Sequence, residues 1–341
     1  MVRISNPPKI VAELSGNHGG KIERAMSLIE LAASSGADYV KLQTYQPDLI
    51  TINSSAEGFV ITDSKSAWYG RSLYDLYTEG TTPLEWHRDI FEFAKSLNMP
   101  IFSTPFDLKS VDFLEKLGCE RYKIASFEIT YKALIKSVAQ TGKPLIISTG
   151  MSTLEEISEA LDWARNAGAT DITLLKCTSS YPAPLSDLNL IAMTELGKAF
   201  QVKYGFSDHT LGFLAACAAT ALGATIIEKH ITLDSHDGAL DSAFSSDKKS
   251  FPEFVRAIRL TYEALGGEKF GVSESEQNSI RHRRSLYFRR NLKVGDLISD
   301  EDLLIVRPAL GIAPKHFEDF VGRRLTRDAI ENELVTWDHI K

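Results

Sequence analysis

The chain has 341 residues, enough for one large domain and a smaller one, because single hydrophobic cores rarely serve more than about 250–300 residues. Its net charge of -7 argues against a protein that binds nucleic acid through a general positive surface. The sequence has no run of about 18 apolar residues and starts without an apolar signal core, so we expect no membrane span and no secretion signal. The three cysteines, Cys119, Cys177 and Cys217, show no paired spacing, which indicates a reducing, cytoplasmic setting.

Most of the chain alternates short apolar runs with helical patterns. The runs predict strands over residues 10–15, 39–45, 100–106, 122–128, 145–150, 172–179, 203–209 and 225–232. The helical patterns cover residues 21–34, 83–97, 108–117, 131–141, 153–167, 189–200, 211–222 and 251–265. Eight strand–helix units over about 260 residues predict a (β/α)8 TIM barrel. A doubly wound open sheet is the alternative, but the loop G-N-H-G-G at 16–20 is not the Gly-rich fingerprint which that fold normally carries.

A long insertion over residues 46–82 follows the second predicted strand. It contains the aromatic segment W-Y-G-R-S-L-Y-D-L-Y at residues 68–77. Loops of this length inside a compact domain are usually functional or disordered. The aromatic content argues against disorder, so the insertion is expected to have a function.

The pattern changes after residue 266. Residues 266–278 are rich in Gly, Ser and Glu and are interpreted as a linker. Short strands are predicted over 284–288 and 303–307, among roughly sixty residues that are marginal for an independent core. The predicted domains are a barrel over 1–266, a linker over 267–282 and a small β-rich domain over 283–341 that rests against a barrel, its own or a partner's.

Nearly every predicted strand ends in polar residues. Active sites of (β/α)8 barrels lie at the C-terminal ends of the strands, so these residues are expected to meet in one site. A purely structural barrel interior would favour branched apolar residues there. The strand-end residues are Glu13, Asn17, Lys41, Gln43, Ser103, Thr104, Lys123, Ser126, Glu128, Ser148, Thr149, Thr178, Ser179, Tyr181, Ser207, Asp208, His209, Glu228, Lys229 and His230.

Two histidines, His209 and His230, end the seventh and eighth strands beside carboxylates and hydroxyls. Two imidazoles at one rim of a parallel sheet can hold a divalent metal and leave coordination positions open for substrate. The alternative is that they are ordinary core or surface histidines.

Two lysines, Lys41 and Lys123, are predicted to form a cradle for a phosphate. Lysine supplies point charge, and hydroxyls supply directed hydrogen-bond donors. The hydroxyls predicted to join them are those of Thr104, Ser126, Ser148 and Ser207. The alternative for each lysine is a solvated or salt-bridged structural role.

Two carboxylates, Glu13 and Glu128, are suited to proton transfer or to binding sugar hydroxyls. Alternatively, each is the ion-pair partner of one of the two lysines. Ser148 and His209 also suggest a Ser–His hydrolase, but no G-x-S-x-G nucleophile elbow is present.

A set of ordered motifs resembles the sialic acid synthase family over almost the whole chain. The motifs are A-E-L-S-G-N-H-G-G (12–20), G-A-D-Y-V-K-L-Q-T-Y (36–45), F-S-T-P-F-D (102–107), Y-K-I-A-S-F-E (122–128), G-K-P-L-I-I-S-T-G-M (142–151), K-C-T-S-S-Y-P-A-P (176–184), S-D-H-T-L-G (207–212) and G-A-T-I-I-E-K-H-I-T-L-D (223–234). The segment from residue 283, with R-R-S and V-R-P, resembles the antifreeze-like (SAF) domain of that family, a small fold of β-clip type. The resemblance implies an enzyme that condenses phosphoenolpyruvate with an amino-sugar aldehyde.

The resemblance also implies roles for individual residues. Glu13, Glu128, His209 and His230 would be catalytic, and the two histidines would bind Mn²⁺, or Mg²⁺ or Co²⁺ in its place. The implied phosphoenolpyruvate contacts are Lys41, Thr104, Lys123, Ser126, Ser148, Ser179 and Ser207, with Ser179 where the sialic acid branch tends to carry Asn. The implied sugar contacts are Gln43, Tyr181, Asp241 and Arg307. Arg307 would come from the other subunit, which implies a domain-swapped homodimer.

The acceptor sugar is inferred from differences within the family. The segments 68–77, 176–184 and 241–245 resemble the pseudaminic acid synthase branch, whereas sialic and legionaminic acid synthases more often show G-P-D-H-x-x-S at the last of these. G-A-L-D at 238–241 departs from the usual Gly-Pro or Gly-Gly before Asp. The implied acceptor is 2,4-diacetamido-2,4,6-trideoxy-L-altrose, whose 6-deoxy carbon would contact the aromatic residues of 68–77.

Three alternatives remain open at this stage. The first is the same reaction on another sugar, as in an N-acetylneuraminate or legionaminic acid synthase. The second is a non-catalytic glycan-binding protein that reuses the SAF domain, against which the intact set of strand-end Lys, His and Glu argues. The third is an aldolase that forms a Schiff base on Lys41 or Lys123.

Overall fold

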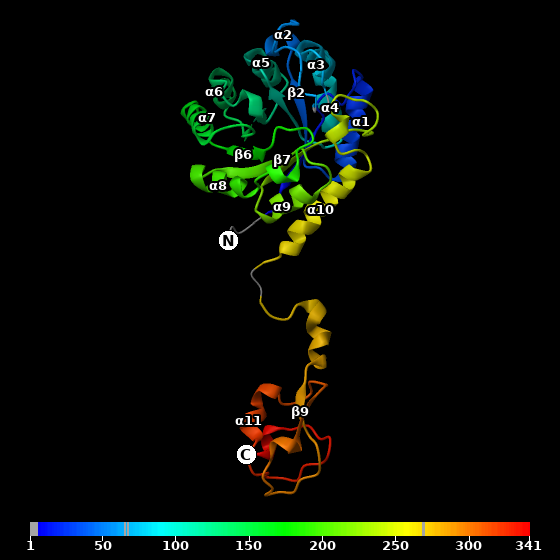
Figure 1. The fold of residues 1–341 in the computed structure, drawn as a ribbon, viewed down its shortest axis with the longest axis vertical. Helices are drawn as coiled ribbons and strands as arrows, with labels where there is room; N and C mark the ends of the chain where they lie inside the picture. The colour runs from blue at the N-terminus through cyan, green and yellow to red at the C-terminus, as the bar shows by residue number, and fades with distance from the viewer. Residues whose placement is uncertain (1–5, 65, 67, 268–269) are drawn as a thin grey trace. The chain divides into compact units, whose positions relative to one another are not determined.

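The structure is a computed structural model that describes residues 6–64, 66, 68–267 and 270–341. Eight parallel strands form a closed barrel in sequence order, and β8 pairs with β1 (Figure 1). The strands are β1 (Lys9–Glu13), β2 (Tyr39–Thr44), β3 (Ile101–Pro105), β4 (Tyr122–Ile124), β5 (Leu145–Ser148), β6 (Ile172–Cys177), β7 (Lys203–Asp208) and β8 (Ile226–His230). The predicted TIM barrel is therefore confirmed, and the open doubly wound sheet is excluded.

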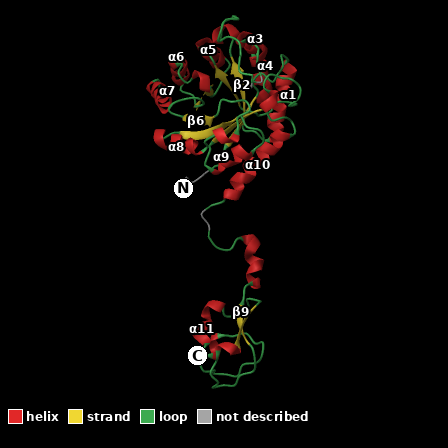
Figure 2. Ribbon diagram, viewed as in Figure 1, coloured by secondary structure: helices red, strands yellow, loops and turns green. Residues whose placement is uncertain are grey.

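Helices surround the barrel strands, as Figure 2 shows in red around yellow. They are α1 (Ile22–Ser35), α4 (His87–Ser96), α5 (Leu108–Lys116), α6 (Lys132–Gln140), α7 (Leu154–Asn166), α8 (Ile191–Phe200), α9 (Leu214–Ala221) and α10 (Ser250–Leu265). Each packs an apolar stripe against the outer face of the strands, as Leu134, Ile135 and Val138 do on α6. The helices thus cover the outer face of the barrel strands, and the polar strand-end side chains lie at one end of the barrel interior.

Helix α7 shows how local sequence sets a helix boundary. Its N-cap is Thr153, whose hydroxyl accepts the N–H of Glu156 at 3.2 Å, while the Glu156 carboxylate accepts the N–H of Thr153 at 2.8 Å. This reciprocal capping box satisfies two amide donors that the helix itself leaves unpaired. The helix thus begins at Leu154, directly after its cap.

Two predicted elements differ from the structure at the active end of the barrel. The fourth strand stops at Ile124, and Ser126–Glu128 forms a short 3-10 helix instead of continuing as strand. Helix α9 begins at Leu214, three residues after its predicted start at Leu211. Both differences lengthen the irregular segments that follow the strands, where function is expected.

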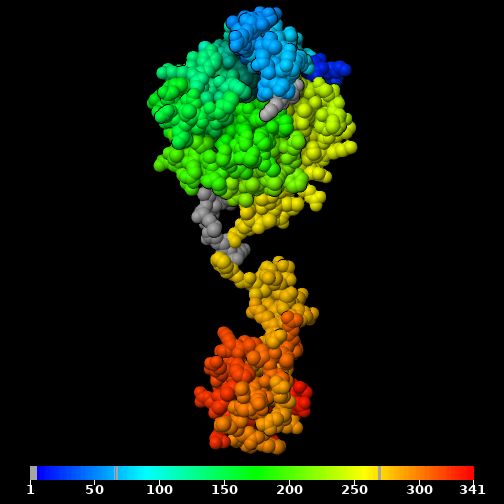
Figure 3. Space-filling model, in the orientation of Figure 1, coloured from blue at the N-terminus to red at the C-terminus, as the bar shows by residue number. Residues whose placement is uncertain are grey.

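The insertion after β2 is ordered by two short helices, α2 (Pro47–Ile50) and α3 (Leu73–Gly80). Ser72 caps α3 by accepting the N–H of Asp75 at 3.0 Å. In the space-filling view, the light-blue atoms of the insertion lie together on the barrel unit (Figure 3).

The chain divides into two compact units, residues 1–266 and 267–341. In the second unit β9 (Ser285–Phe288) and β10 (Leu303–Val306) pair antiparallel, and α11 (Phe317–Phe320) follows. Its small core contains Leu286, Phe288, Leu292, Ile298, Leu303, Phe320, Leu325, Ala329 and Val335. Within the segment predicted as a linker, residues 274–282 form a 3-10 helix capped by Ser273 and Glu276.

Among the described residues, no helix is both long enough and apolar enough to cross a membrane.

The close packing around Gly205 in β7 predicts that a side chain at this position lowers the stability of the barrel. A Cβ on Gly205 in β7 would collide with the carbonyl oxygen of Ile226 in β8 and the side chain of Leu175 in β6. We expect Gly205→Ala to lower the free energy of unfolding of the barrel by about 3 kcal/mol, because rigid backbone must move. Chemical denaturation measures this, and Gly267→Ala, which has no atom within 4 Å of the added Cβ, is the matched control. Equal stability of the two variants would contradict the prediction.

Candidate active site

A cavity of about 370 Å³ opens at the C-terminal ends of the barrel strands. The predicted site residues that line it are Lys41, Gln43, Thr104, Lys123, Ser126, Glu128, Ser148, Tyr181, Ser207, His209, His230 and Asp241. Glu13, Ser179 and Arg307 do not line it. Polar side chains from all parts of the barrel therefore meet in one place.

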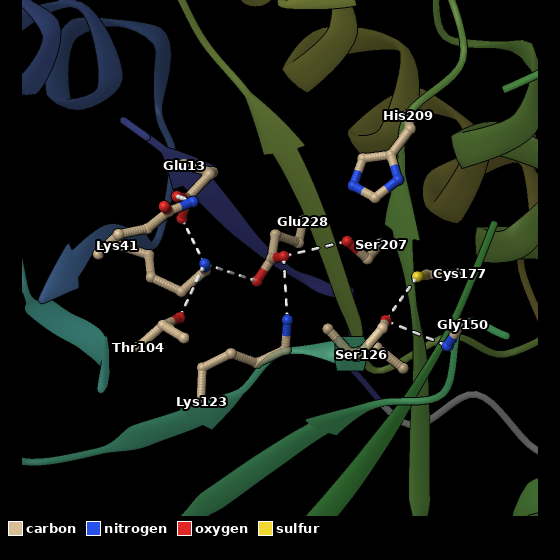
Figure 4. A network of polar contacts seen from close by, with 12 residues as sticks. Glu13, Lys41, Thr104, Lys123, Ser126, Gly150, Cys177, Ser207, His209 and Glu228 are labelled. Atoms are coloured by element: carbon tan, nitrogen blue, oxygen red, sulfur yellow. Dashed lines mark hydrogen bonds and ion pairs between the residues drawn. The ribbon is translucent and has the colours of Figure 1, made fainter. Parts of the chain in front are cut away.

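Lys41 stands at the centre of a buried charge network (Figure 4). Its ammonium group forms an ion pair with Glu13, lies 3.8 Å from Glu228 Oε2 and donates to Thr104 Oγ1 at 3.1 Å. The Lys41 side chain is 5% exposed, so these contacts replace water around its charge. Although burial lowers the pKa of Lys41, Glu13 and Glu228 outweigh that effect and raise it. The lysine is held cationic.

Glu228 was a strand-end residue in the sequence but was not predicted to have a site role. It accepts Lys123 Nζ at 3.2 Å and Ser207 Oγ at 3.0 Å on its Oε1 atom (Figure 4). Burial raises the pKa of Glu228, but Lys123 and Lys41 overcome this and lower it to about 2. Glu228 lies two residues before His230 in β8, on the same face of the strand. That period-two spacing was the available signal.

Glu13 lies behind Lys41 and is completely buried. Its Oε1 atom accepts Gln43 Nε2 at 3.1 Å and the N–H of Ser15 at 3.2 Å. Burial raises the pKa of Glu13 despite the Lys41 ion pair. The alternative of an ion-pair partner for a lysine therefore describes Glu13 in this structure.

Hydroxyl groups gather beside the two lysines. Ser126 Oγ accepts the N–H of Gly150 at 3.1 Å and lies 3.2 Å from Cys177 Sγ (Figure 4). Ser148 Oγ is buried and has no hydrogen-bond partner among the described residues. Ser179, behind the cavity wall, lies 3.7 Å from Cys177 Sγ. Free hydroxyl donors beside two ammonium groups fit a phosphate.

The two histidines lie side by side, with ring centroids 5.4 Å apart. Burial lowers the pKa of His209 to about 4, and burial followed by the influence of His209 lowers the pKa of His230. Both imidazoles are therefore neutral, the form that binds metals. His209 Nδ1 lies 2.9 Å from the carbonyl oxygen of Thr178, which fixes the ring and leaves Nε2 as the acceptor.

The donor set fits a metal site completed by substrate. His230 Nδ1 is buried without a hydrogen-bond partner among the described residues. No group of three or more His, Cys, Asp and Glu suited to a metal occurs in the described ranges, so the protein offers the two imidazoles. Further ligands would come from water and substrate oxygens, as in catalytic sites that keep positions open.

Asp241 reaches the site from the loop after β8. Its Oδ2 atom lies 3.8 Å from His230 Nδ1 and accepts the hydroxyl of Ser15, and its N–H donates to Asn17 Oδ1 at 3.0 Å. Burial raises the pKa of Asp241 to about 6. Ser15 was not predicted as a site residue, because only the fold brings it beside a loop 226 residues away.

Aromatic side chains cover the histidines. The Tyr181 ring centroid lies 4.4 Å from His209, 5.0 Å from Phe244 and 5.8 Å from Trp68. Trp68 belongs to the insertion for which a function was expected. The insertion therefore contributes directly to the cavity wall, with Trp68, Leu73, Leu76 and Tyr77.

Comparison with known proteins agrees with this geometry. The NeuB family model matches residues 28–270, and the SAF domain model matches residues 283–341. The chain belongs to the NeuB family. It is 41% identical to the pseudaminic acid synthase of Helicobacter pylori over 98% of both chains. It is 39% identical to the N,N'-diacetyllegionaminic acid synthase of Campylobacter jejuni over 96% of this chain and 98% of that protein.

A solved structure extends the likeness to three dimensions. The N-acetylneuraminic acid synthetase of Leptospira borgpetersenii, in complex with citrate, matches with a TM-score of 0.70 and 29% identity over 81% of this chain and 90% of that one. This NeuB-family chain is therefore a sugar acid synthase, which is a transferase. The enzymes of the family use phosphoenolpyruvate and an amino sugar as substrates. The alternative of a glycan-binding protein without catalytic activity is therefore wrong.

Glu128 differs from Glu13 in its surroundings. It lies in the turn after β4, lines the cavity, and its Oε2 atom has no hydrogen-bond partner among the described residues. Burial raises the pKa of Glu128 to about 7, and nearby Lys123 limits the rise. A carboxyl group that is half protonated near neutral pH is suited to proton transfer.

The network around Glu228 predicts a phosphate-dependent stability effect. In Glu228→Gln, Lys123 loses its buried counter-charge, so we expect the free energy of unfolding to fall by about 3 kcal/mol. Inorganic phosphate should raise the melting temperature of this variant more than that of the wild type. Glu195→Gln, which removes an exposed pair with Lys198, is the control and should melt like the wild type. An equal phosphate response in both proteins would contradict the role of Glu228.

Proposed function

We propose that this protein is a pseudaminic acid synthase that condenses phosphoenolpyruvate with 2,4-diacetamido-2,4,6-trideoxy-L-altrose and releases phosphate. The observation that carries the proposal is one cavity in which two buried lysines and free hydroxyls adjoin a pair of neutral histidines. Full-length similarity to pseudaminic acid synthases supports the choice of sugar. Similarity to legionaminic acid synthases makes that precursor the second candidate.

The phosphate of phosphoenolpyruvate would lie between Lys41 and Lys123. Both ammonium groups are buried, so their attraction for an anion is little screened by water. The hydroxyls proposed to donate to the phosphate and carboxylate oxygens are those of Thr104, Ser126, Ser148 and Ser207. Ser179 lies one layer behind them and would act through Cys177 and Ser126.

His209 and His230 would hold a divalent metal, which supplies Lewis acidity toward the aldehyde oxygen of the acceptor. Mn²⁺ is the metal we propose, with Mg²⁺ or Co²⁺ as replacements. Asp241 Oδ2 lies 3.8 Å from His230 Nδ1, beyond hydrogen-bond distance, and would act on the site through its charge. Gln43, Tyr181 and Asp241 line the cavity and would contact the sugar.

The reaction forms one carbon–carbon bond and breaks one carbon–oxygen bond. Carbon 3 of phosphoenolpyruvate attacks the aldehyde carbon, whose oxygen takes up a proton, and carbon 2 becomes electron-deficient. Water then forms a bond to carbon 2 and gives up one proton. The bond from carbon 2 to the bridging oxygen breaks, phosphate leaves with that oxygen and takes the remaining hydroxyl proton, and carbon 2 becomes a ketone. Glu128 is the proposed base for the water, because its carboxylate is free at the cavity surface. Glu13 would instead hold Lys41 and Gln43 in position.

We also propose a domain-swapped homodimer in the cytoplasm. No arginine of the described residues lines the cavity, so a guanidinium contact to the sugar would have to come from elsewhere. Arg307 in the second unit is exposed and meets that need. The free thiols of Cys119, Cys177 and Cys217 are consistent with a reducing compartment.

A product assay tests the proposed function. The purified chain with Mn²⁺ and phosphoenolpyruvate is given 2,4-diacetamido-2,4,6-trideoxy-L-altrose, the legionaminic acid precursor or N-acetylmannosamine. We expect phosphate release and a nonulosonic acid, identified by mass spectrometry, to be at least about tenfold faster with the altrose sugar. Faster turnover of either other sugar would overturn the assignment.

The metal and lysine roles have separate controls. Chelation should abolish turnover and Mn²⁺ should restore it, whereas His209→Ala should stay inactive with Mn²⁺ although it is folded. Borohydride should trap no sugar or pyruvate on Lys41 or Lys123, since the lysines bind anions here. Trapping would support the aldolase alternative instead.

The raised pKa of Glu128 predicts a pH dependence. Its carboxyl group is protonated below about pH 7 and becomes a base above it, so kcat should rise with pH through about 7. Glu128→Gln should lose about 10²- to 10⁴-fold in kcat. The residual rate of the variant should show no inflection at this pH. A pH profile that keeps the same inflection in the variant would show that another group is the base.

A further inference from the structure

Part of the cavity wall is apolar and comes from loops outside the barrel strands. Ile50, Ile61, Trp68, Leu73 and Leu76 of the insertion line the cavity together with Leu240 of the loop after β8. None of the five aliphatic side chains can hydrogen-bond. The wall is therefore chemically unlike the strand ends, which present ammonium, imidazole and hydroxyl groups.

Contacts between rings connect the histidines to this wall. The Phe244 ring centroid lies 5.2 Å from His230 and 6.2 Å from Trp68. Trp68 in turn donates its indole N–H to the carbonyl oxygen of Leu240 at 3.0 Å. A molecule whose reacting end lies at the histidines thus extends past the aromatic rings toward Leu240.

Leu240 occupies a notch formed by two glycines. A Cβ on Gly16 would lie 3.1 Å from Leu240 Cδ2, and a Cβ on Gly80 would lie 2.8 Å from the same atom. The missing side chains of Gly16, after β1, and Gly80, at the end of α3, leave the space that Leu240 fills. Three distant segments together position one leucine at the cavity surface.

The indole N–H of Trp68 is already used by Leu240, so it offers nothing to a ligand. A hydroxyl placed against the five aliphatic side chains would lose its hydrogen bonds to water without gaining a partner from them, which is costly. A methyl group placed there would be favoured by burial of its apolar surface. The wall therefore discriminates between CH₃ and CH₂OH at the end of the acceptor.

We propose that Leu240, held by Trp68, is a specificity-determining residue that selects acceptors whose terminal carbon 6 is a methyl group. The proposal rests on the proposed function, since it takes the aldehyde end of the sugar to lie at His209 and His230. An added hydroxyl in an apolar pocket is rejected by up to about 100-fold in kcat/KM. We expect a preference of about 10- to 100-fold for the 6-deoxy sugar.

The test compares two sugars that differ by one oxygen atom. They are 2,4-diacetamido-2,4,6-trideoxy-L-altrose and its 6-hydroxy counterpart, 2,4-diacetamido-2,4-dideoxy-L-altrose. The ratio of their kcat/KM values is measured for the wild type, Leu240→Asn and Trp68→Phe with saturating phosphoenolpyruvate and Mn²⁺. Leu240→Asn gives the hydroxyl a partner, so the ratio should fall at least about tenfold.

Trp68→Phe keeps an aromatic ring but removes the hydrogen bond to Leu240, and its ratio should fall by a smaller factor. The KM for phosphoenolpyruvate should change by less than about twofold in both variants, since the lysine cradle is untouched. Leu260→Asn is the matched control: Leu260 is exposed on α10 outside the cavity, and its ratio should equal that of the wild type.

Equal kcat/KM for the two sugars in the wild type would overturn the proposal. So would an unchanged ratio in Leu240→Asn with a normal KM for phosphoenolpyruvate. If Leu240→Asn does not fold, the ratio of kcat/KM values for Trp68→Phe is used instead. A ratio below that of the wild type supports the proposal, and an unchanged ratio overturns it. Failure of the proposed function looks different, because then neither altrose sugar gives product.

Discussion

The structure of the site depends on neutralising two buried ammonium groups. Lys41 and Lys123 point inward at the ends of β2 and β4, where water is largely excluded. An unpaired charge in such a place would shift its pKa until it was neutral. Glu228 from β8 serves both lysines, and Glu13 from β1 serves Lys41. Closure of the barrel, which brings β8 beside β1, is therefore also a condition for charge balance.

The same constraint bears on the anion binding that we propose for this site. Glu228 is ionised, whereas burial raises the pKa of Glu13. Burial also lowers the pKa of Lys123, although Glu228 opposes this effect. The hydroxyl of Ser148, with no partner among the described residues, adds a donor. In the proposed function, a phosphate would meet charges and donors that the fold already holds in place, so little reorganisation would accompany its binding.

The barrel and its strand-end chemistry could be predicted because both follow from local patterns. Short apolar runs define the strands, which are three to six residues long, and the period of two places Lys41, Lys123 and His230 on the inner face. The turn over Ser126–Glu128 could not be predicted, since Y-K-I-A-S-F-E has the composition of a strand. Glu228 was recognised as a strand end, but its shared pairing with two lysines depends on how strands far apart in sequence meet.

The proposed chemistry and the proposed choice of acceptor depend on different parts of the barrel unit. The strands hold the lysines and histidines rigidly, while the insertion and the loop after β8 supply the apolar wall. The position of Leu240 at the cavity could not be predicted from the sequence. It depends on two glycines in distant segments, Gly16 after β1 and Gly80 at the end of α3. It precedes Asp241, which lies 3.8 Å from His230 Nδ1. In the proposed complex, the end of the acceptor and the imidazole of His230 would therefore be linked through adjacent residues of one loop. A terminal group that fits badly against Leu240 would shift the adjacent Asp241 and its charge beside His230, so selectivity would be expressed in turnover as well as in binding.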